Sequence, residues 1–499
     1  MAKGLRAKLF ASRIYDLSLG ARAQPPRPVP ADLLELSVSP AAPDDSLAWL
    51  AGLDPAADGA TRENARARLG EWLSTNRQWR ADSWRADLIG QRLAHVIPRF
   101  SVITEGAGAD FQTVLANQLH REARHLFRLA TAERNAHDPF STGLGAVMAA
   151  RYLPGFERRI GQAVNDLLDQ LAQWVYPDGG HRARQPERHH DALAALIQVR
   201  AVLADGGYAF PELLQGAIDR MTPMLRAYLL GDGGFALFNG AGQGDPVAIE
   251  RTLELSDSQA KAAASAPHTG FHRIHAQRTA VLFDVGRPVS TPVTVGHAGT
   301  LGFEMSVGNH RLIVNCGGGR SAGRNLAEAL RATAAHSTLT VANINSSDLV
   351  PGGFGPRRAE NVSARRREHD RNVLVEATHD GYREPFGLSH RRLLYLARDG
   401  LDLRGEDVLE AESGTGRVFD IRFHLHPDVA ASLSAGGRSA LLRLPTGRGW
   451  RLGISDGNLA LEESVYAGEG KPRTSQQLVI TGRHARRRTV TKWRLAREG

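Results

Sequence analysis

The sequence has a single cysteine and no long hydrophobic run. Cys316 is alone among 499 residues, so the chain can form neither an internal disulfide nor a cluster of several thiolates around a metal. No apolar run reaches the roughly 18 residues that a membrane-spanning helix needs. The motif H-E-x-x-H is missing, as is a phosphate loop that ends in Gly-Lys-Ser or Gly-Lys-Thr. These absences exclude a disulfide scaffold, a helical membrane-spanning protein and the common zinc-protease and P-loop classes.

Basic residues outnumber acidic ones. The 62 Lys and Arg against 53 Asp and Glu give a net charge of +9, which favours an acidic partner. Nucleic acid, anionic lipid and a uronic-acid polysaccharide all fit this charge, and so does a solvated arginine-rich surface. The triple-arginine runs at residues 365–367 and 486–488 have few aromatic neighbours, so neither is a stacking platform for single-stranded nucleic acid. We therefore rank nucleic acid last among the partners.

The N-terminal residues resemble a secretory signal only in part. They are basic, but Arg13 and Asp16 interrupt the apolar stretch of about 7 to 15 residues that such a signal needs. We expect a soluble chain without a cleaved signal, in the cytoplasm or the periplasm. Six prolines between Gln24 and Pro43 predict an extended lead-in, which we place at residues 1–45.

The hydrophobic period divides the rest of the chain into two parts. At residues 160–175 the apolar side chains form one stripe of an amphipathic helix, and similar stripes recur up to about residue 228. Beyond Asn239 the period changes to two, which is typical of half-buried strands. Strand pairs around short turns are expected at 303–314, 391–403 and 440–454. Helices followed by strands predict an all-α domain at residues 46–265 and an antiparallel β-sandwich at residues 266–499.

Residues 176–190 form the most unusual segment. Pro177 and two glycines end one helix, and Pro186 suits the first turn of the next, so a tight loop is expected between them. The loop displays a dense group of imidazoles and guanidiniums: His181, Arg184, Arg188, His189 and His190. Guanidinium binds a carboxylate through a planar fork and imidazole exchanges a proton near neutral pH, so the loop suits a sugar carboxylate. The alternative is an exposed helix cap with hydrated histidines.

A second polar group lies at the edges of predicted strands. It contains His297, Asn315, Arg331 and His336. Strands of a sandwich can bring the two histidines together as acid and base partners or as metal ligands, although a hydrogen-bonded structural role is the alternative for each. Two histidines and an asparagine are too few for a stable zinc site, so we predict no metal. Asn239 is expected to be positioned by a glycine-rich turn.

These motifs resemble those of the heparinase II/III-like polysaccharide lyases. The residues that carry the resemblance are Asp178-Gly-Gly-His with Arg184 and Pro186, His297 with Leu301 and Phe303, Val314-Asn-Cys-Gly, and Ala335-His-Ser-Thr. The resemblance spans roughly residues 80–495 and is strongest in the β half. It implies an α+β multidomain fold, in which an N-terminal incomplete α/α toroid is followed by a C-terminal antiparallel β-sandwich. This architecture agrees with the change of period.

Members of this family cleave acidic polysaccharides by β-elimination, so the resemblance implies a carbon–oxygen lyase. The C5 proton of a uronate is barely acidic until its carboxylate is neutralised. A base then removes that proton, and an acid protonates the departing glycosidic oxygen. In such lyases Asn or His commonly neutralises the carboxylate, while Tyr and His serve as base and acid.

The chain departs from the family pattern at several positions. Arg188 occupies the place of the usual catalytic tyrosine. His297 lines up with the second histidine of a His-x-His-x-Asp motif, whose first histidine and aspartate are replaced by Val295 and Gly299. Asn315 stands where an aspartate is common. Two hypotheses stay open: a regrouped active site, or a scaffold that binds polysaccharide without cutting it.

We predict a lyase-like protein that cleaves an acidic, uronate-containing glycan by β-elimination and needs no cofactor. The expected catalytic residues, around one cleft, are His181, Arg184, His189, His297 and His336. The expected substrate-binding residues are Arg188, Asn239, Asn315 and Arg331. A non-catalytic protein that binds acidic polysaccharide is the alternative.

Overall fold

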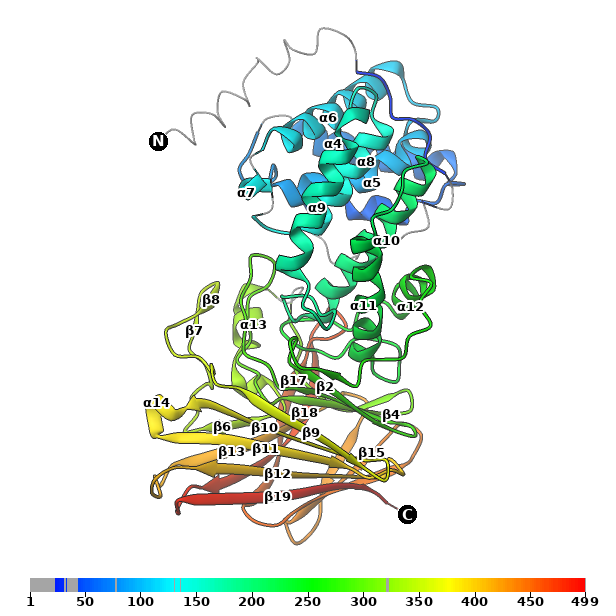
Figure 1. Cartoon of the computed structure of the whole chain (residues 1–499). Coiled ribbons are helices and arrows are strands. Elements are labelled where there is room, and N and C mark those ends of the chain that lie inside the picture. Colours follow the sequence, from blue (N-terminus) through cyan, green and yellow to red (C-terminus); the bar gives the residue numbers. More distant parts are fainter. Residues whose placement is uncertain are drawn as a thin grey trace. The chain divides into compact units, whose positions relative to one another are not determined.

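The computed structural model describes residues 23–30, 33, 44–76, 79–129, 131–134, 136–319 and 323–498 (Figure 1). By its internal contacts the chain divides into two compact units. Within the described residues, unit 1 comprises the chain up to Trp174, Asp191–Ile218 and Glu254–Ser256. Unit 2 comprises Val175–His190, Asp219–Leu253 and the chain from Asp257 onward. The domain limits expected from the sequence stay a prediction. Most of the expected lead-in lies outside the described residues, and residues 23–30 have no regular secondary structure.

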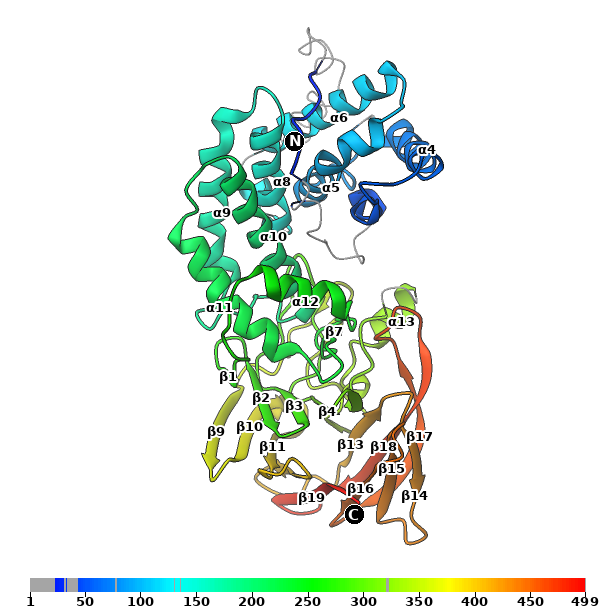
Figure 2. The same cartoon turned by 90° about the vertical axis from the view of Figure 1, so that its right-hand side faces the viewer.

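Unit 1 is helical. Its longer helices are α4 (Gly59–Asn76), α5 (Ala86–Thr104), α6 (Ala109–Arg128), α8 (Pro139–Tyr152) and α9 (Ile160–Trp174), which are labelled in Figure 2. Most of α10 (Pro186–Asp205) also belongs to unit 1. The first part of α11 (Glu212–Tyr228) and four short elements complete it: η1 (Asp44–Ser46), η2 (Ala48–Gly52), α7 (Thr131–Arg134) and η3 (Glu157–Arg159). The stripe predicted at residues 160–175 is α9, which buries Leu167 and Leu171. Among the described residues, no helix is both long and apolar enough to cross a bilayer.

Helices α5 and α8 approach each other closely in unit 1. A Cβ placed on Gly90 would lie 2.2 Å from the Ser141 carbonyl oxygen, and one on Gly145 would lie 2.3 Å from the Gly90 Cα. Only glycine leaves room for this contact of two backbones. Beside it, Arg92 on α5 and Glu122 on α6 form a buried ion pair, with Nε and Oε1 2.9 Å apart.

Unit 2 is built on two large antiparallel sheets. The nine-stranded sheet has the order β1-β2-β3-β4-β5-β13-β18-β17, with β6 paired to β13. Its strands are β1 (Ser265–Ala266), β2 (Phe271–Ala276), β3 (Thr279–Asp284), β4 (Phe303–Val307), β5 (His310–Val314), β6 (Leu339–Val341), β13 (Val418–Leu425), β17 (Asn458–Tyr466) and β18 (Arg473–Arg483). The eight-stranded sheet has the order β14-β15-β16-β19-β12-β11-β10-β9.

The remaining elements of unit 2 are short or belong to the second sheet. The strands of that sheet are β9 (Ser363–His369), β10 (Asn372–Tyr382), β11 (Leu388–Leu396), β12 (Asp402–Glu410), β14 (Ala430–Leu433), β15 (Ser439–Arg443), β16 (Gly449–Ile454) and β19 (Arg488–Arg497). The others are a small hairpin of β7 (Leu349–Val350) and β8 (Gly353–Phe354), the short helices α13 (Arg324–Ala329), η5 (Thr333–Ala335) and α14 (Arg383–Phe386), and most of α12 (Pro246–Leu255).

One apolar core lies between the two sheets. It joins Phe283, Phe303 and Ile421 of the nine-stranded sheet to Leu394 and Trp450 of the eight-stranded sheet. The burial along β11 alternates strictly, which the period of two predicts for a strand with one face on a core. The three strand pairs expected from the sequence are the hairpins β4–β5, β11–β12 and β15–β16. The antiparallel sandwich is therefore confirmed.

Two helices are followed by the same kind of turn. An Asp-Gly-Gly sequence follows α9, where Val175 bridges His181, and another follows α11, where Leu229 bridges Phe235. The first glycine of each has a positive φ, 88° at Gly179 and 81° in the second turn. We did not predict this repeat from the sequence. The turns lead into two loops of unit 2 that carry polar residues expected at the site.

Candidate functional site

A cavity in unit 2 is lined by residues from both polar groups of the sequence. Its volume is about 460 Å³. The polar lining residues are Gln185, Arg188, Asn239, Thr291, Thr294, His297, Glu328 and Arg331. Glycines and aliphatic residues complete the wall. We call this space the His297 cavity.

Hydrogen bonds behind the cavity determine which nitrogen of His297 carries a proton. His336 Nδ1 lies 2.8 Å from the carbonyl oxygen of Ala332, so this nitrogen is the donor. In a neutral ring, Nε2 of His336 is then an acceptor, and His297 Nδ1 donates to it across 3.2 Å. The lone pair of His297 is therefore on Nε2. That atom faces Gly240, where a Cβ would come within 2.9 Å of it.

Burial keeps both imidazoles neutral. The exposed fractions of His297 and His336 are 6% and 2%. Burial is the main cause that holds the pKa of His297 well below its usual value, and the nearby His336 and Arg331 lower this pKa further. The Leu330 carbonyl acts in the opposite direction and raises it. Burial also lowers the pKa of His336 to about 4. A neutral His297 with its lone pair on Nε2 can accept a proton.

Two loops are joined at the wall of the cavity. Asn239 Nδ2 donates to the Arg184 carbonyl at 2.7 Å, and Gln185 Nε2 donates to the Asn239 carbonyl at 3.0 Å. Asn239 has a φ of +52°, a left-handed conformation that asparagine tolerates better than most residues. Asn239 thus holds the wall through its side-chain amide. Arg188, in the first turn of α10, lines the same cavity.

Arg331 supports the wall of the cavity through its guanidinium. Nε donates to the Gly296 carbonyl at 3.1 Å, and Nη1 donates to the Val350 carbonyl at 3.0 Å and to the Glu328 carboxylate. Nη2 donates to the Gly353 carbonyl. These bonds tie the segment before β4, the β7–β8 hairpin and the end of α13 to one side chain. Most of its donors are used by the fold.

Arg184 is buried in an ion pair and does not line the His297 cavity. Its guanidinium donates to Asp284, and the two side chains are 2% and 5% exposed. Nε also donates to the Thr269 carbonyl at 2.6 Å, and Nη1 donates to the Arg287 carbonyl. Burial raises the pKa of Asp284, although Arg184 opposes this. Arg184 therefore fastens the loop before α10 to the end of β3.

His181 and His189 stabilise the first Asp-Gly-Gly turn. The backbone N–H of His181 lies 3.3 Å from His189 Nδ1, and His189 Nε2 donates to the Met221 carbonyl at 2.9 Å. Both ring nitrogens of a neutral His189 thus have partners. Burial lowers the pKa of His181 to about 3 and that of His189 to about 4. Neither residue is among those that line the cavity.

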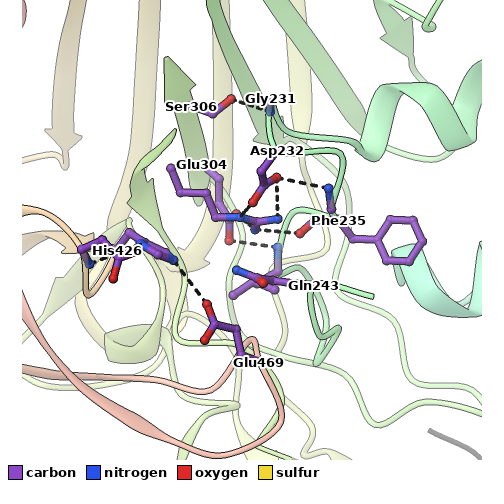
Figure 3. Close-up of polar contacts among 12 residues, drawn as sticks. Gly231, Asp232, Phe235, Gln243, Glu304, Ser306, His426 and Glu469 are labelled. Atoms are coloured by element: carbon purple, nitrogen blue, oxygen red, sulfur yellow. Dashed lines mark hydrogen bonds and ion pairs between the residues drawn. The ribbon is translucent and has the colours of Figure 1, made fainter. Parts of the chain in front are cut away.

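A buried charged cluster lies against the second turn. Figure 3 shows Asp232 and Glu304 in it. Glu304 accepts hydrogen bonds from the backbone N–H of Leu237 at 3.0 Å and of Asn315 at 2.8 Å. Arg311 Nε donates to Asp232 at 2.7 Å. Burial raises the pKa of Glu304 to about 7, although Arg311 and the two N–H groups act against it.

Asn315 supports the segment that carries His336. Its Oδ1 accepts a hydrogen bond from the backbone N–H of Ser337 at 2.9 Å, and its side chain is fully buried. Asn315 is not among the residues that line the cavity. It belongs to the framework behind the histidine pair.

The structure brings together part of the predicted site. Arg188, Asn239, His297 and Arg331 line one cavity, and His336 is hydrogen-bonded to His297. The remaining four lie in supporting networks: His181, Arg184, His189 and Asn315. The sequence did not single out Gln185, Thr294 or Gly240 at the cavity. Gln185 had one signal, its place beside Pro186 at a helix start. Among the described residues, no group of three or more His, Cys, Asp or Glu could hold a metal ion.

The protein belongs to a class in which a helical part is followed by an antiparallel β-sandwich. In this chain the sandwich unit carries a pair of hydrogen-bonded histidines. A family model for the heparinase II/III-like C-terminal domain matches residues 258–494. The chain is 33% identical over 442 residues to FtsZ-localized protein C of Caulobacter vibrioides, covering 85% of this chain and 75% of that protein. The chain belongs to the heparinase II/III-like family.

Solved lyases share this architecture. Heparan sulfate lyase HepC of Pedobacter heparinus aligns with a TM-score of 0.60 at 16% identity, covering 91% of this chain and 75% of that one. A heparinase III aligns with a TM-score of 0.68 at 11% identity, covering 91% and 76%. These likenesses confirm the predicted fold class, an α/α toroid followed by an antiparallel β-sandwich.

Proposed function

We propose that the protein binds an acidic, uronate-containing glycan in the His297 cavity and cleaves it by β-elimination. One observation carries this proposal: the Ala332–His336–His297 chain of hydrogen bonds leaves the lone pair on Nε2 of a cavity-lining imidazole. The family relationship and the similar fold of a heparan sulfate lyase support a polysaccharide substrate.

In this proposal Arg188 and His297 perform the three steps of the elimination. The Arg188 guanidinium pairs with the uronate carboxylate and so acidifies the C5–H bond. His297 Nε2 takes the C5 proton, and that electron pair forms the C4–C5 double bond while the C4–O bond breaks. The imidazolium returns the proton to the departing oxygen. Since burial depresses the pKa of His297, its protonated form is a strong acid and gives up the proton readily.

Three of the residues expected to be catalytic act as supports in this proposal. They support the loop that leads to Arg188 at the start of α10. Arg184 and His189 donate to backbone carbonyls, and Arg184 also pairs with Asp284. His181 Nδ1 accepts a hydrogen bond from the Ala183 N–H at 3.2 Å. Their positions can change the rate only through the geometry of the loop. His297 and Arg188 are the residues that contact the glycan.

The test is a panel of uronate polysaccharides incubated with the protein. Cleavage produces unsaturated ends that absorb in the ultraviolet. We expect product with at least one polysaccharide and its loss in His297→Gln. His369→Gln, which changes a histidine with a 90% exposed side chain, is the matched control and should retain the activity. Absence of product across the panel would rule out cleavage.

The non-catalytic alternative is distinguished by binding. If a polysaccharide binds and the wild-type protein forms no product, the scaffold binds acidic glycan without cutting it. Arg188→Gln should then weaken that binding by roughly tenfold, as the loss of one charge-assisted pair predicts. Unchanged binding in this variant would remove the His297 cavity from both hypotheses.

A second candidate function comes from the relative named for its localisation to FtsZ. We infer that this chain also localises with FtsZ, because the similarity extends over 85% of its length. Co-sedimentation with FtsZ polymers is the test. The protein is expected in the pellet when polymers form and in the supernatant when nucleotide is withheld. Its presence in the supernatant in both cases would contradict the inference.

A further inference from the structure

The eight-stranded sheet has a groove on its outer face. Its volume is about 590 Å³. The residues that line it are Leu374, Leu393, Tyr395, Arg404, Gly405, Glu406, Arg438, Gly453, Ile454, Ser455, Lys492, Trp493 and Arg494. None of them lines the His297 cavity. We call this space the sheet groove.

The strand register explains why a depression forms there. One row across the sheet runs from Gly453 on β16 through Arg494 on β19, Arg404 on β12 and Tyr395 on β11 to Leu374 on β10. Successive members of a row point to the same face of a sheet. A Cβ on Gly453 would meet no atom within 4 Å. The missing side chain therefore leaves open space at the end of the row.

Apolar side chains form the central part of the groove. Leu374, Leu393 and Tyr395 are all partly exposed on the outer face, next to one another on β10 and β11. The guanidinium of Arg404 lies over the ring of Tyr395, 5.5 Å from its centroid. This contact holds the cation at the edge of the apolar strip.

Cations surround the apolar strip. Arg404 and Arg494 share the single carboxylate of Asp402, at 2.7 Å and 2.8 Å, and they remain 58% and 60% exposed. Lys492 is 68% exposed and lies 3.8 Å from Glu406. The lining contains four cationic side chains and one carboxylate. The groove thus has excess positive charge around an apolar centre.

We propose that the sheet groove binds an acidic peptide segment with apolar side chains. Its leucine-like side chains would contact Leu374, Leu393 and Tyr395, and its carboxylates would pair with Arg404, Arg494 and Lys492. Polysaccharide hydroxyls lose their water against leucine side chains without gaining a hydrogen bond, so the apolar strip favours a peptide. This inference is independent of the proposed lyase function.

The probe is a fluorescein-labelled peptide in which Glu and Leu alternate, and anisotropy measures its binding to the full chain. Two companion peptides replace Leu by Ser and Glu by Lys. We expect binding of the first peptide only, weakened by added salt. Binding of the Lys-Leu peptide with equal affinity, or absence of binding of the Glu-Leu peptide, would overturn the proposal.

Two variants locate the site. Gly453→Leu fills the open space without a backbone clash, and Arg404→Glu/Arg494→Glu reverses the charge; each should weaken binding by roughly tenfold or more. Arg443→Glu changes an exposed arginine on β15 of the same sheet and should leave the affinity unchanged. Equal effects of all three variants would overturn the assignment. It would also be overturned if an acidic oligosaccharide displaced the peptide and Gly453→Leu left the affinity for the peptide unchanged. Urea unfolding midpoints near the wild-type value show that each variant is folded.

Discussion

At the residue scale, burial separates the arginines that hold the fold from those that can meet a ligand. Arg184 and Asp284 are both almost fully buried, and the guanidinium also donates to three backbone carbonyls. Removing one partner of such a pair leaves the other charge buried without compensation. Arg188, four residues later, lines the cavity instead. The sequence alone does not show which of the two arginines is buried and which lines the cavity.

Arg184→Met should therefore act on stability. We expect the free energy of unfolding to fall by about 3–5 kcal/mol, because the variant leaves the Asp284 carboxylate buried and unpaired. Urea unfolding followed by circular dichroism measures this. Arg182→Met, which changes an exposed arginine of the same loop, should cost at most about 0.5 kcal/mol. Similar losses in both variants would contradict the structural role of Arg184.

The candidate site could be predicted from the sequence only in part, and the reason lies in its hydrogen-bond partners. His297 and His336 were expected at strand edges, and they do meet. The supporting roles of Arg184 and His189 were missed because their partners are backbone carbonyls, Thr269 and Met221, that no residue type reveals. Side-chain chemistry is visible in a sequence, whereas the position of a carbonyl depends on the folded backbone.

At the element scale, the two Asp-Gly-Gly turns differ in how tightly they are packed. A Cβ on Gly179 would lie 2.0 Å from the Arg220 carbonyl oxygen, whereas one on Gly233 would have its nearest neighbour at 3.4 Å. Both glycines have positive φ. The flanking residues of the two turns differ, and for this reason the repeat was not evident in the sequence.

Gly179→Ala should destabilise the protein more than Gly233→Ala. Both variants pay for a left-handed alanine, at about 1 kcal/mol, and only the first adds a clash with backbone. We expect the first to lower the free energy of unfolding by a further 1–3 kcal/mol, roughly the cost of overpacking. Thermal unfolding of the two variants side by side checks the order. A larger loss of stability in Gly233→Ala would show that the turn after α9 shifts to remove the clash in Gly179→Ala.

Glu304 connects β4 to the second turn, and its ionisation should be visible in stability. Its pKa is about 7 in the folded chain, mainly through burial, against an ordinary value of 4.5. A raised folded-state pKa gives stability that is present below the unfolded pKa and lost as the pH rises through about 7. Relative to Glu304→Gln, the wild type should lose on the order of 2–3 kcal/mol between about pH 5 and about pH 8. A constant difference across this range would contradict the assignment.

At the scale of the whole molecule, the change of hydrophobic period predicted a helical part followed by an antiparallel β-sandwich, and the resemblance to the lyase family implied the toroid. The division into compact units was less visible. Val175–His190 and Asp219–Leu253 group with the sandwich, although both contain helical residues. Periodicity describes which face of a helix is apolar and not which neighbour that face contacts. Helices α10 and α11 each contribute to both units, which a local pattern cannot indicate.

Buried histidines should make the whole protein sensitive to acid. Burial lowers the folded-state pKa of His181 to about 3 and of His189 and His336 to about 4, from 6.5. Their stabilising contribution is present above pH 6.5 and is lost as the pH falls toward these values. Between about pH 6 and pH 5 the free energy of unfolding should fall by about 1 kcal/mol per pH unit for each histidine. Urea titrations at several pH values measure the slope, and a slope near zero would show that these rings are accessible to protons.

In the proposed function, His297 presents an unprotonated Nε2 to an acidic glycan. The most direct measurement is the imidazole ¹⁵N spectrum of the histidine-labelled protein at neutral pH, with the His297 signals assigned by their loss in His297→Gln. We expect a protonated Nδ1, an unprotonated Nε2, and a shift of the Nε2 signal when a uronate oligosaccharide is added. A proton on Nε2, or an Nε2 signal unchanged by an oligosaccharide that binds the protein, would contradict it.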